Sequence, residues 1–269
     1  MSKTKKIETT YIFGVPVHGL PQKDVLRIIE KNIISKTKKY ISITSGELMY
    51  NVRRVKFLKD FINNAELSLS DSASVSINGF FRGKKINRFT GPKLLLECSR
   101  YGANKKWKHF FCGGADGVAD LLSEKLKKKY PGLHTVGTYC PPFRQLTLEE
   151  EEEMIKTINQ SKADILWIGL GVVKQEEWIN KFIHRVNVSW VVGVGGAFDY
   201  YAGTMQRCPD WVSAIGMEWL YRFVKEPWRY KRSISVFVFA FEGLIESIFG
   251  KAPILGDLFG AQIPGWQKK

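Results

Sequence analysis

The chain has 269 residues, of which 44% are hydrophobic, and it carries a formal net charge of +15. This length allows one large domain or two small ones, and the hydrophobic fraction is sufficient for a buried core. The positive charge indicates polyanionic partners, such as nucleic acid, anionic lipid or phosphorylated substrates. The four cysteines are widely spaced and form no C-x-x-C pair, which argues against a zinc knuckle or a disulfide framework and indicates a reduced, cytosolic setting.

No secretory signal or membrane-spanning helix is expected. The first ten residues, MSKTKKIETT, contain no apolar region of the kind that a signal peptide needs. The longest apolar run, residues 234–241, is too short to cross a bilayer, and Glu242 and Glu246 interrupt its extension.

After an arm that ends near Pro21, predicted helices alternate with predicted strands. In chain order these elements are the helix 23–34, the strand 40–44, the helix 47–62, the strand 67–70, the helix 92–101, the strand 109–112, the helix 117–129, the strand 135–138, the helix 148–161, the strand 165–168, the helix 175–184 and the strand 190–194. Residues 72–91 indicate turns and no clear element. The alternation predicts an α/β fold, with a mostly parallel, Rossmann-like sheet flanked by helices.

The pattern changes after Pro209. No further strand followed by glycines occurs, and residues 212–249 predict helices rich in aromatic and basic side chains. The glycines and prolines of residues 252–269 indicate a poorly ordered tail. We therefore divide the chain into an α/β core, residues 1–211, and a helical, basic C-terminal appendage, residues 212–269.

Two of the predicted strands, 165–168 and 190–194, end in glycines that polar residues follow. Ligands bind at the carboxyl ends of the strands in open α/β sheets, and glycines there let the backbone approach them closely. The expected floor of this crevice consists of Gly169, Gly171, Gly193, Gly195 and Gly196, and its expected lining consists of Lys174, Gln175, Glu176, Asp199 and Arg207. Two ordinary turns with surface charges remain the alternative.

Two further strand ends could carry chemistry. Asp71 follows the strand 67–70, where a carboxylate is well placed as a general base, although it could equally cap the next element. Gly113 and Gly114 belong to a glycine-rich turn that could pass a phosphate, but this turn matches neither a Walker loop nor G-x-G-x-x-G.

The segment 222–232, RFVKEPWRYKR, alternates basic residues with aromatic ones and precedes an apolar helix. This composition favours an element that lies in an anionic membrane interface. A helix packed on the protein's own core is the alternative, and nucleic-acid binding is a third, for which no known module is present.

The sequence contains no motif that indicates a metal site or a serine hydrolase. The four histidines form no closely spaced pair, and no D-x-D follows a strand. The motif G-x-S-x-G is also absent.

Several blocks together resemble one family, the WecG/TagA/CpsF bacterial glycosyltransferases. IGLGVVKQEEWI resembles the block GLG-x-PKQE-x-W, and VGVGGAFDYYAGTMQRCPDW resembles GVGGAFD-x-x-AG-x-x-x-RAP-x-W. GMEWLYRFVKEPWRYKR resembles LEW-x-x-R-x-x-x-EP-x-R-x-x-R, and RGKKINRFTG resembles G-x-x-x-x-R-x-x-G. The match covers roughly residues 40–232.

The resemblance implies an inverting glycosyltransferase that needs neither a metal nor another cofactor. Such an enzyme moves a hexose or N-acetylhexosamine from a UDP-sugar to an undecaprenyl-diphosphate-linked sugar. It works peripherally at the cytoplasmic face of the bacterial plasma membrane, in cell-wall polymer, capsule or exopolysaccharide synthesis. The appendage would reach the membrane and help to close the site. The resemblance leaves open whether the protein forms a homo-oligomer.

The resemblance also assigns roles to single residues. Asp71 would be the catalytic base, and Thr44 would lie near the substrate pocket. Arg88, Gln175 and Asp199 match positions that recognise the donor or its diphosphate. Without a metal, arginines must stabilise the leaving UDP, and the candidates are Arg88, Arg207, Arg222, Arg229 and Arg232.

The sequence departs from the family pattern next to the proposed sugar pocket. The motif A-D-G is S-D-S around Asp71, and TSGE lacks the asparagine of T-x-N. These changes leave the donor sugar open. They also motivate an alternative, a non-catalytic member of the family that binds a nucleotide or a lipid carrier and acts as a scaffold in the same pathway.

Overall fold

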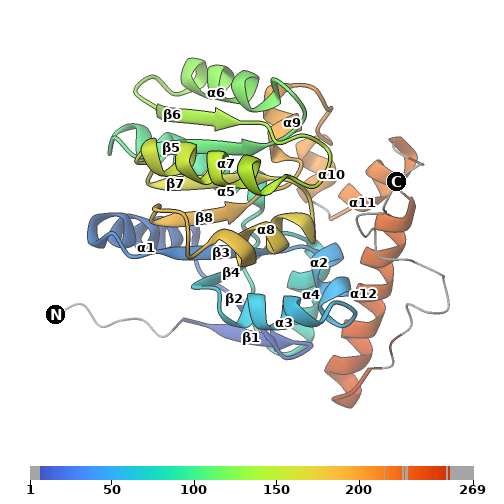
Figure 1. The fold of residues 1–269 in the computed structure, drawn as a ribbon. Helices are drawn as coiled ribbons and strands as arrows, with labels where there is room; N and C mark the ends of the chain where they lie inside the picture. The colour runs from blue at the N-terminus through green and yellow to red at the C-terminus, as the bar shows by residue number, and fades with distance from the viewer. Residues whose placement is uncertain (1–6, 215, 226, 228–229, 253, 255–269) are drawn as a thin grey trace.

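The computed structural model describes residues 7–214, 216–225, 227, 230–252 and 254. An eight-stranded sheet runs through the protein in the order β1-β2-β4-β3-β8-β7-β5-β6, and within it only β1 is antiparallel to its neighbour (Figure 1). The strands are β1 (Thr9–Ile12), β2 (Val15–His18), β3 (Lys39–Thr44), β4 (Leu67–Ser70), β5 (Lys108–Gly113), β6 (His134–Tyr139), β7 (Ile165–Gly169) and β8 (Trp190–Gly193).

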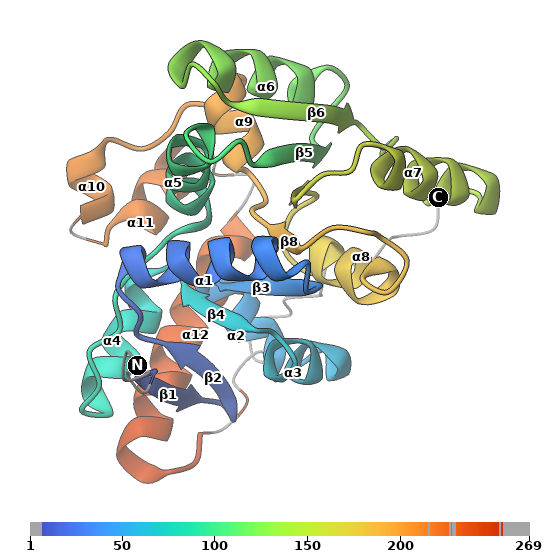
Figure 2. The same ribbon diagram turned by 90° about the vertical axis from the view of Figure 1, so that its left-hand side faces the viewer.

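Helices cover both faces of this sheet, as Figures 1 and 2 show. One face carries α1, α5, α6 and α9, and the other carries α2, α3, α7 and α8. The helices are α1 (Gln22–Ser35), α2 (Gly46–Val52), α3 (Lys56–Asn63), α4 (Ala73–Phe81), α5 (Gly91–Ala103), α6 (Val118–Lys129), α7 (Leu148–Gln160), α8 (Lys174–Phe182), α9 (Ala197–Ala202), α10 (Asp210–Ala214), α11 (Glu218–Lys225) and α12 (Tyr230–Phe249).

The central strands are apolar because helices bury them on both sides. All four residues of β8 are buried, and Trp167 of β7 and Trp190 of β8 have no exposed surface. Continuous apolar runs of this kind are typical of parallel strands inside an α/β sheet. The predicted fold class is therefore confirmed: a mostly parallel α/β sheet with flanking helices and a helical C-terminal region.

Three local predictions were wrong. The expected N-terminal arm is a hairpin, β1-β2, whose turn places Phe13 at φ 53° and Gly14 at φ 72°, the backbone that two-residue hairpins prefer. The expected helix 47–62 is broken into α2 and α3, and the unassigned residues 72–91 contain α4.

The C-terminal helices α10, α11 and α12 lie at the carboxyl edge of the sheet (Figures 1 and 2). α12 packs against α2 and α4 and buries Val238, Phe239 and Glu242. Glu242 has no exposed surface and forms ion pairs with Arg53, at 2.9 Å, and Arg54, at 2.7 Å. Both apolar and polar contacts thus attach this helix to the core.

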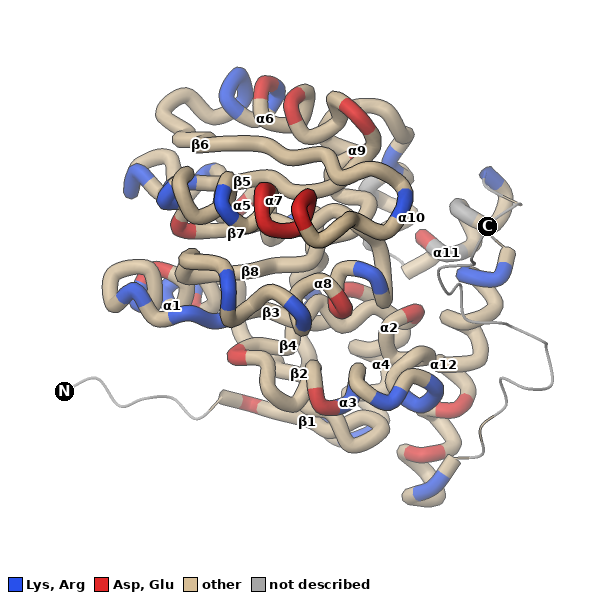
Figure 3. Tube along the Cα trace, viewed as in Figure 1, with Lys and Arg blue, Asp and Glu red and all other residues tan. Residues whose placement is uncertain are grey.

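Basic residues are spread over the molecule and are not confined to the C-terminal region. Figure 3 shows lysine and arginine on α1, α3 and α6 as well as on α12, whereas the start of α7 is acidic. No helix in the described part of the chain is long and apolar enough to cross a membrane.

Candidate active site

Asp71 lies at the carboxyl edge of the sheet. It follows β4 directly, and its backbone N–H donates to the carbonyl oxygen of Thr44 at the end of β3, at 3.1 Å. Its carboxylate oxygen Oδ1 accepts from the backbone N–H of Gly91, at 2.8 Å, where α5 begins. The neighbouring strand thus holds the backbone of Asp71, and a helix start holds its half-buried carboxylate.

A cavity of about 720 Å³ lies beside Asp71, where β5, β7 and β8 end, and we call it the glycine-lined cavity. It is lined by predicted residues from these strand ends and the following helices, namely Gly114, Gly169, Gly171, Lys174, Gln175, Gly193, Gly195, Gly196, Asp199 and Arg207. Its size lies within the range of about 300–1,000 Å³ that is usual for sites of small molecules and cofactors.

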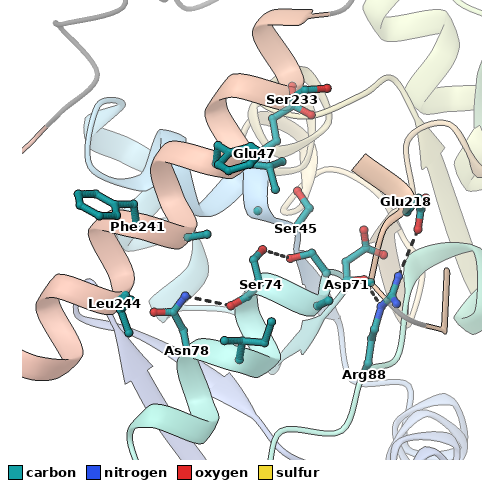
Figure 4. Close-up of a pocket in the computed structure, with 18 of the residues that line it drawn as sticks. Ser45, Glu47, Asp71, Ser74, Asn78, Arg88, Glu218, Ser233, Phe241 and Leu244 are labelled. Carbon is teal, nitrogen blue, oxygen red and sulfur yellow. Dashed lines mark hydrogen bonds and ion pairs between the residues drawn. The ribbon is translucent and has the colours of Figure 1, made fainter. Parts of the chain in front are cut away.

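A second cavity of about 460 Å³ opens on the other side of Asp71, between α2, α4 and α12. We call it the helical cavity, and Figure 4 shows its lining. Ser45, Asp71, Glu218 and Arg232 line both cavities, so the Asp71 carboxylate lies where the two meet. Sequence reasoning predicted only one crevice, because the helical cavity needs α4, which it missed.

Arg88 connects Asp71 to the C-terminal helices. Its Nε donates to the backbone carbonyl of Asp71 at 2.8 Å, and its Nη1 donates to the carbonyl of Ser213 at 2.6 Å. Its Nη2 forms an ion pair with Glu218 at 3.2 Å. Arg88, predicted from the resemblance to recognise the donor or its diphosphate, lines the helical cavity (Figure 4) and does not line the glycine-lined one. Glu218 was not predicted, although it stands in the GMEW block.

The glycines at the strand ends fall into two groups. Gly171 and Gly195 line the cavity with positive φ angles of 85° and 52°, a backbone that favours glycine. Gly169 also lines it, and a Cβ there would lie 2.7 Å from the ring of Phe198. Gly113 lines neither cavity: a Cβ there would lie 2.7 Å from the backbone of Gly169 in β7, so its small size serves the packing of two strands.

Gln175 and Glu176 are buried at the start of α8. Gln175 Oε1 accepts from the backbone N–H of Gly195 at 2.9 Å, and its Nε2 donates to Glu176 at 2.9 Å. Glu176 also accepts from the backbone N–H of Val173 at 2.6 Å. Burial raises the pKa of Glu176 to about 7. This chain of bonds holds the glycine loop at the end of β8 against α8.

Lys174, Asp199 and Arg207 come together on the glycine-lined cavity. Asp199 Oδ1 accepts from the hydroxyl of Thr204 at 3.2 Å, which fixes its side chain. Lys174 is the first residue of α8, and the positive end of the helix dipole there favours an anion. A lysine, an arginine and a helix start around one cavity suit a phosphorylated ligand.

The structure does not bring the Thr44 side chain to either cavity. Thr44 is fully buried, and its hydroxyl donates to the carbonyl oxygen of Leu69 at 2.8 Å. Its neighbour Ser45 lines both cavities instead, and the Ser45 hydroxyl accepts from the N–H of Leu48 and caps α2. The TSGE stretch thus contributes Ser45, Gly46 and Glu47 to the cavity lining, and not Thr44.

Of the three predicted appendage arginines, Arg232 reaches the site. Its Nε forms an ion pair with Glu47 at 2.7 Å, and it lines both cavities. Arg229 and the side chain of Arg222 lie outside the described residues. Across the part of the chain that is described, no group of three or more histidine, cysteine, aspartate or glutamate residues could hold a metal ion.

Comparison with known proteins gives a consistent result. The family model of the glycosyl transferase WecG/TagA/CpsF family matches residues 10–252. The N-acetylglucosaminyldiphosphoundecaprenol N-acetyl-beta-D-mannosaminyltransferase of Bacillus subtilis (strain 168) is 24% identical over 86% of this chain and 89% of its own length. Proteins of the same name from Bacillus spizizenii and Staphylococcus aureus (strain MW2) are 26% and 27% identical, over 77% and 68% of this chain and 80% and 70% of their own lengths.

Proposed function

Because the chain belongs to the WecG/TagA/CpsF family of glycosyl transferases, we propose that it transfers a hexose or N-acetylhexosamine from a UDP-sugar to an undecaprenyl-diphosphate-linked sugar, without a metal ion. One observation carries this proposal: the Asp71 carboxylate lies where two cavities of different character meet. A transferase must bring two substrates together at one base, and this arrangement offers each of them its own approach.

The donor binds in the glycine-lined cavity. Its diphosphate lies against Lys174, Arg207 and the amino end of α8, where cations and a helix dipole favour negative charge. Gly171 and Gly195 have no side chains, so their backbone can approach the donor closely and the cavity keeps room for the phosphates and the sugar. Asp199 and Gln175 contribute the polar groups that orient the donor and the loop around it.

The acceptor hydroxyl approaches from the helical cavity. Asp71 takes the proton from this hydroxyl while its oxygen bonds to the anomeric carbon of the donor sugar. The bond between that carbon and the UDP oxygen breaks, and its electron pair leaves with UDP. Attack from the side opposite the leaving group inverts the anomeric configuration. Arginines at the junction and in the glycine-lined cavity then stabilise the negative charge of UDP, as preorganised electrostatic groups do.

The reaction takes place peripherally at the cytoplasmic face of the plasma membrane, in the synthesis of a cell-wall polymer, capsule or exopolysaccharide. The names of the curated relatives support this setting, since their acceptor is an undecaprenol-linked diphosphate. The basic residues 222–232 hold the protein at an anionic surface.

The variant Asp71→Asn tests the role of the base. Asparagine keeps the oxygen that accepts from Gly91 N–H but cannot take a proton, so we expect transfer to fall by about 10²–10⁴-fold with UDP binding unchanged. Asp60→Asn, an exposed carboxylate on α3, is the control and should keep full activity. The assay combines UDP-glucose, UDP-galactose, UDP-GlcNAc and UDP-ManNAc with polyprenyl-diphosphate-linked acceptors, with and without EDTA.

Two results would contradict this proposal. Unchanged transfer by Asp71→Asn removes Asp71 as the base, and loss of transfer in EDTA removes metal independence. Thermal stabilisation of the unmodified protein by UDP, without turnover of any donor and acceptor pair, would instead favour the non-catalytic scaffold.

A further inference from the structure

The helical cavity has two ends of different chemistry. One end holds Asp71, Arg88 and Glu218, and the other holds Phe241 and Leu244 of α12, as Figure 4 shows. The apolar end has a second wall on α4, formed by Ile77 and Phe81. A ligand that fills this cavity must therefore be polar where it meets Asp71 and apolar where it leaves between the two helices.

The apolar end is unusually exposed for side chains of this size. Ile77 and Phe81 on α4 are each 53% exposed, and Phe237 and Phe241 on α12 are 56% and 55% exposed. Each pair is four residues apart, so each forms a row along one face of its helix. The adjacent Phe80 is 75% exposed. Contiguous exposed apolar side chains at the mouth of a cavity mark a binding surface.

We propose that the groove between α4 and α12 binds the first isoprenoid units of the polyprenyl chain of the acceptor. This inference rests on the proposed function and names the part of the acceptor that this cavity takes. The cavity is continuous from the apolar rows to Asp71, so a chain in the groove carries its diphosphate and sugar toward the base. A long chain leaves past Phe80 and Phe81, at the open end of the groove.

The contacts around the groove are consistent with a preformed site. Asn78 of α4 donates to the carbonyl of Ser74 at 2.9 Å, and Arg82 donates to Asn78 Oδ1 at 3.2 Å and pairs with Glu246 of α12 at 2.6 Å. The polar groups between α4 and α12 are thus bonded to one another. The apolar rows line the cavity beside these bonds, and α4 joins the C-terminal region in the contact with lipid.

Direct binding of a soluble polyprenyl diphosphate tests the inference without any turnover. The probe is geranylgeranyl diphosphate, inorganic pyrophosphate is its chain-free counterpart, and calorimetry on the full chain measures both dissociation constants. We expect the double variant Ile77→Gln/Phe241→Gln to weaken the binding of geranylgeranyl diphosphate by roughly 10- to 100-fold, because two apolar contacts are lost. It should leave the affinities for pyrophosphate and UDP unchanged.

Phe249→Gln is the matched control, because this phenylalanine lies on the same helix, is 74% exposed and does not line the cavity. Its affinity for the probe should stay within about two-fold of the unmodified protein. Two results would overturn the inference: equal binding of both probes by the unmodified protein, or equal loss for both probes in the double variant.

Other outcomes separate this inference from its alternatives. Conversion of a dimer to a monomer by the double variant, with unchanged affinity for the probe, would identify the rows as an interface between two copies of the chain and overturn the groove. Tight, groove-dependent binding by a protein that transfers no sugar supports the groove and contradicts the proposed function.

Discussion

Replacing Glu176 with glutamine should change how the stability of the protein depends on pH. The carboxyl group of Glu176 is 3% exposed and accepts hydrogen bonds from Val173 N–H and the Gln175 amide. Burial is the main cause that raises its pKa to about 7, although these hydrogen bonds oppose the rise, and the nearby carboxylate of Glu47 adds to it. Glutamine has nearly the same shape and cannot titrate in this range.

The magnitude follows from the difference between the folded and unfolded pKa values. A rise from the ordinary value of 4.5 to about 7 corresponds to about 3 kcal/mol in the free energy of unfolding. Between these two values the folded protein binds more protons at Glu176 than the unfolded chain does. The stabilising contribution is therefore complete below pH 4.5 and is lost as the pH rises through about 7.

Urea unfolding of both proteins between about pH 5 and pH 8, followed by the fluorescence of the buried tryptophans, measures this contribution. His109 gives an opposite slope, since burial lowers its pKa to about 3 and its share of stability is lost as the pH falls below 6.5. His109 is present in both proteins, so it cancels in their difference. We expect the stability of the unmodified protein relative to Glu176→Gln to fall by up to about 3 kcal/mol over this range. A difference that is constant across the range would refute the argument.

Two more substitutions test the packing around the site. Glu242→Gln should lower the free energy of unfolding by about 3–5 kcal/mol, because it removes a fully buried carboxylate that pairs with two half-buried arginines. Glu152→Gln breaks an exposed pair and should cost under about 1 kcal/mol, and equal costs in urea unfolding would contradict this. Gly169→Ala should cost about 1–3 kcal/mol, since its Cβ would lie 2.7 Å from Phe198, whereas Gly196→Ala has its nearest atom at 3.8 Å and should leave stability unchanged; the reverse order of melting temperatures would contradict this.

Most of the sheet could be predicted because its strands are buried on both faces. Continuous apolar runs such as residues 165–168 and 190–194, each ending in glycine, identify the strands without knowledge of their neighbours. The hairpin β1-β2 was missed although Val15 and Val17 alternate with less buried residues, because each strand has only four residues. α4 was missed because its exposed apolar side chains do not show the polar outer face that identifies a helix on the surface.

The candidate site was predictable only where a residue follows a strand directly. Asp71 and the glycine-rich turns have this position. Because the carboxyl ends of parallel strands meet at one edge of a sheet, that edge could be predicted from the sequence. The direction of a side chain at the last residue of a strand could not: Thr44 points into the sheet, and Ser45 lines the cavities. Glu218 stands in the GMEW block, but its contact with Arg88 could not be predicted, because only the fold brings the two together.

The contacts of Arg88 and Glu242 link the C-terminal helices to Asp71 and to the core. Arg88 bonds at once to the backbone of Asp71, to Ser213 and to Glu218, so one guanidinium group links the position of Asp71 to that of residues beyond 211. α12 forms one wall of the helical cavity, while its buried Glu242 attaches it to the core. Displacement of these helices would open both cavities and leave Arg88 with Asp71 alone of these three partners. The C-terminal helices therefore form part of the walls of both cavities, and Arg88 couples their position to that of Asp71.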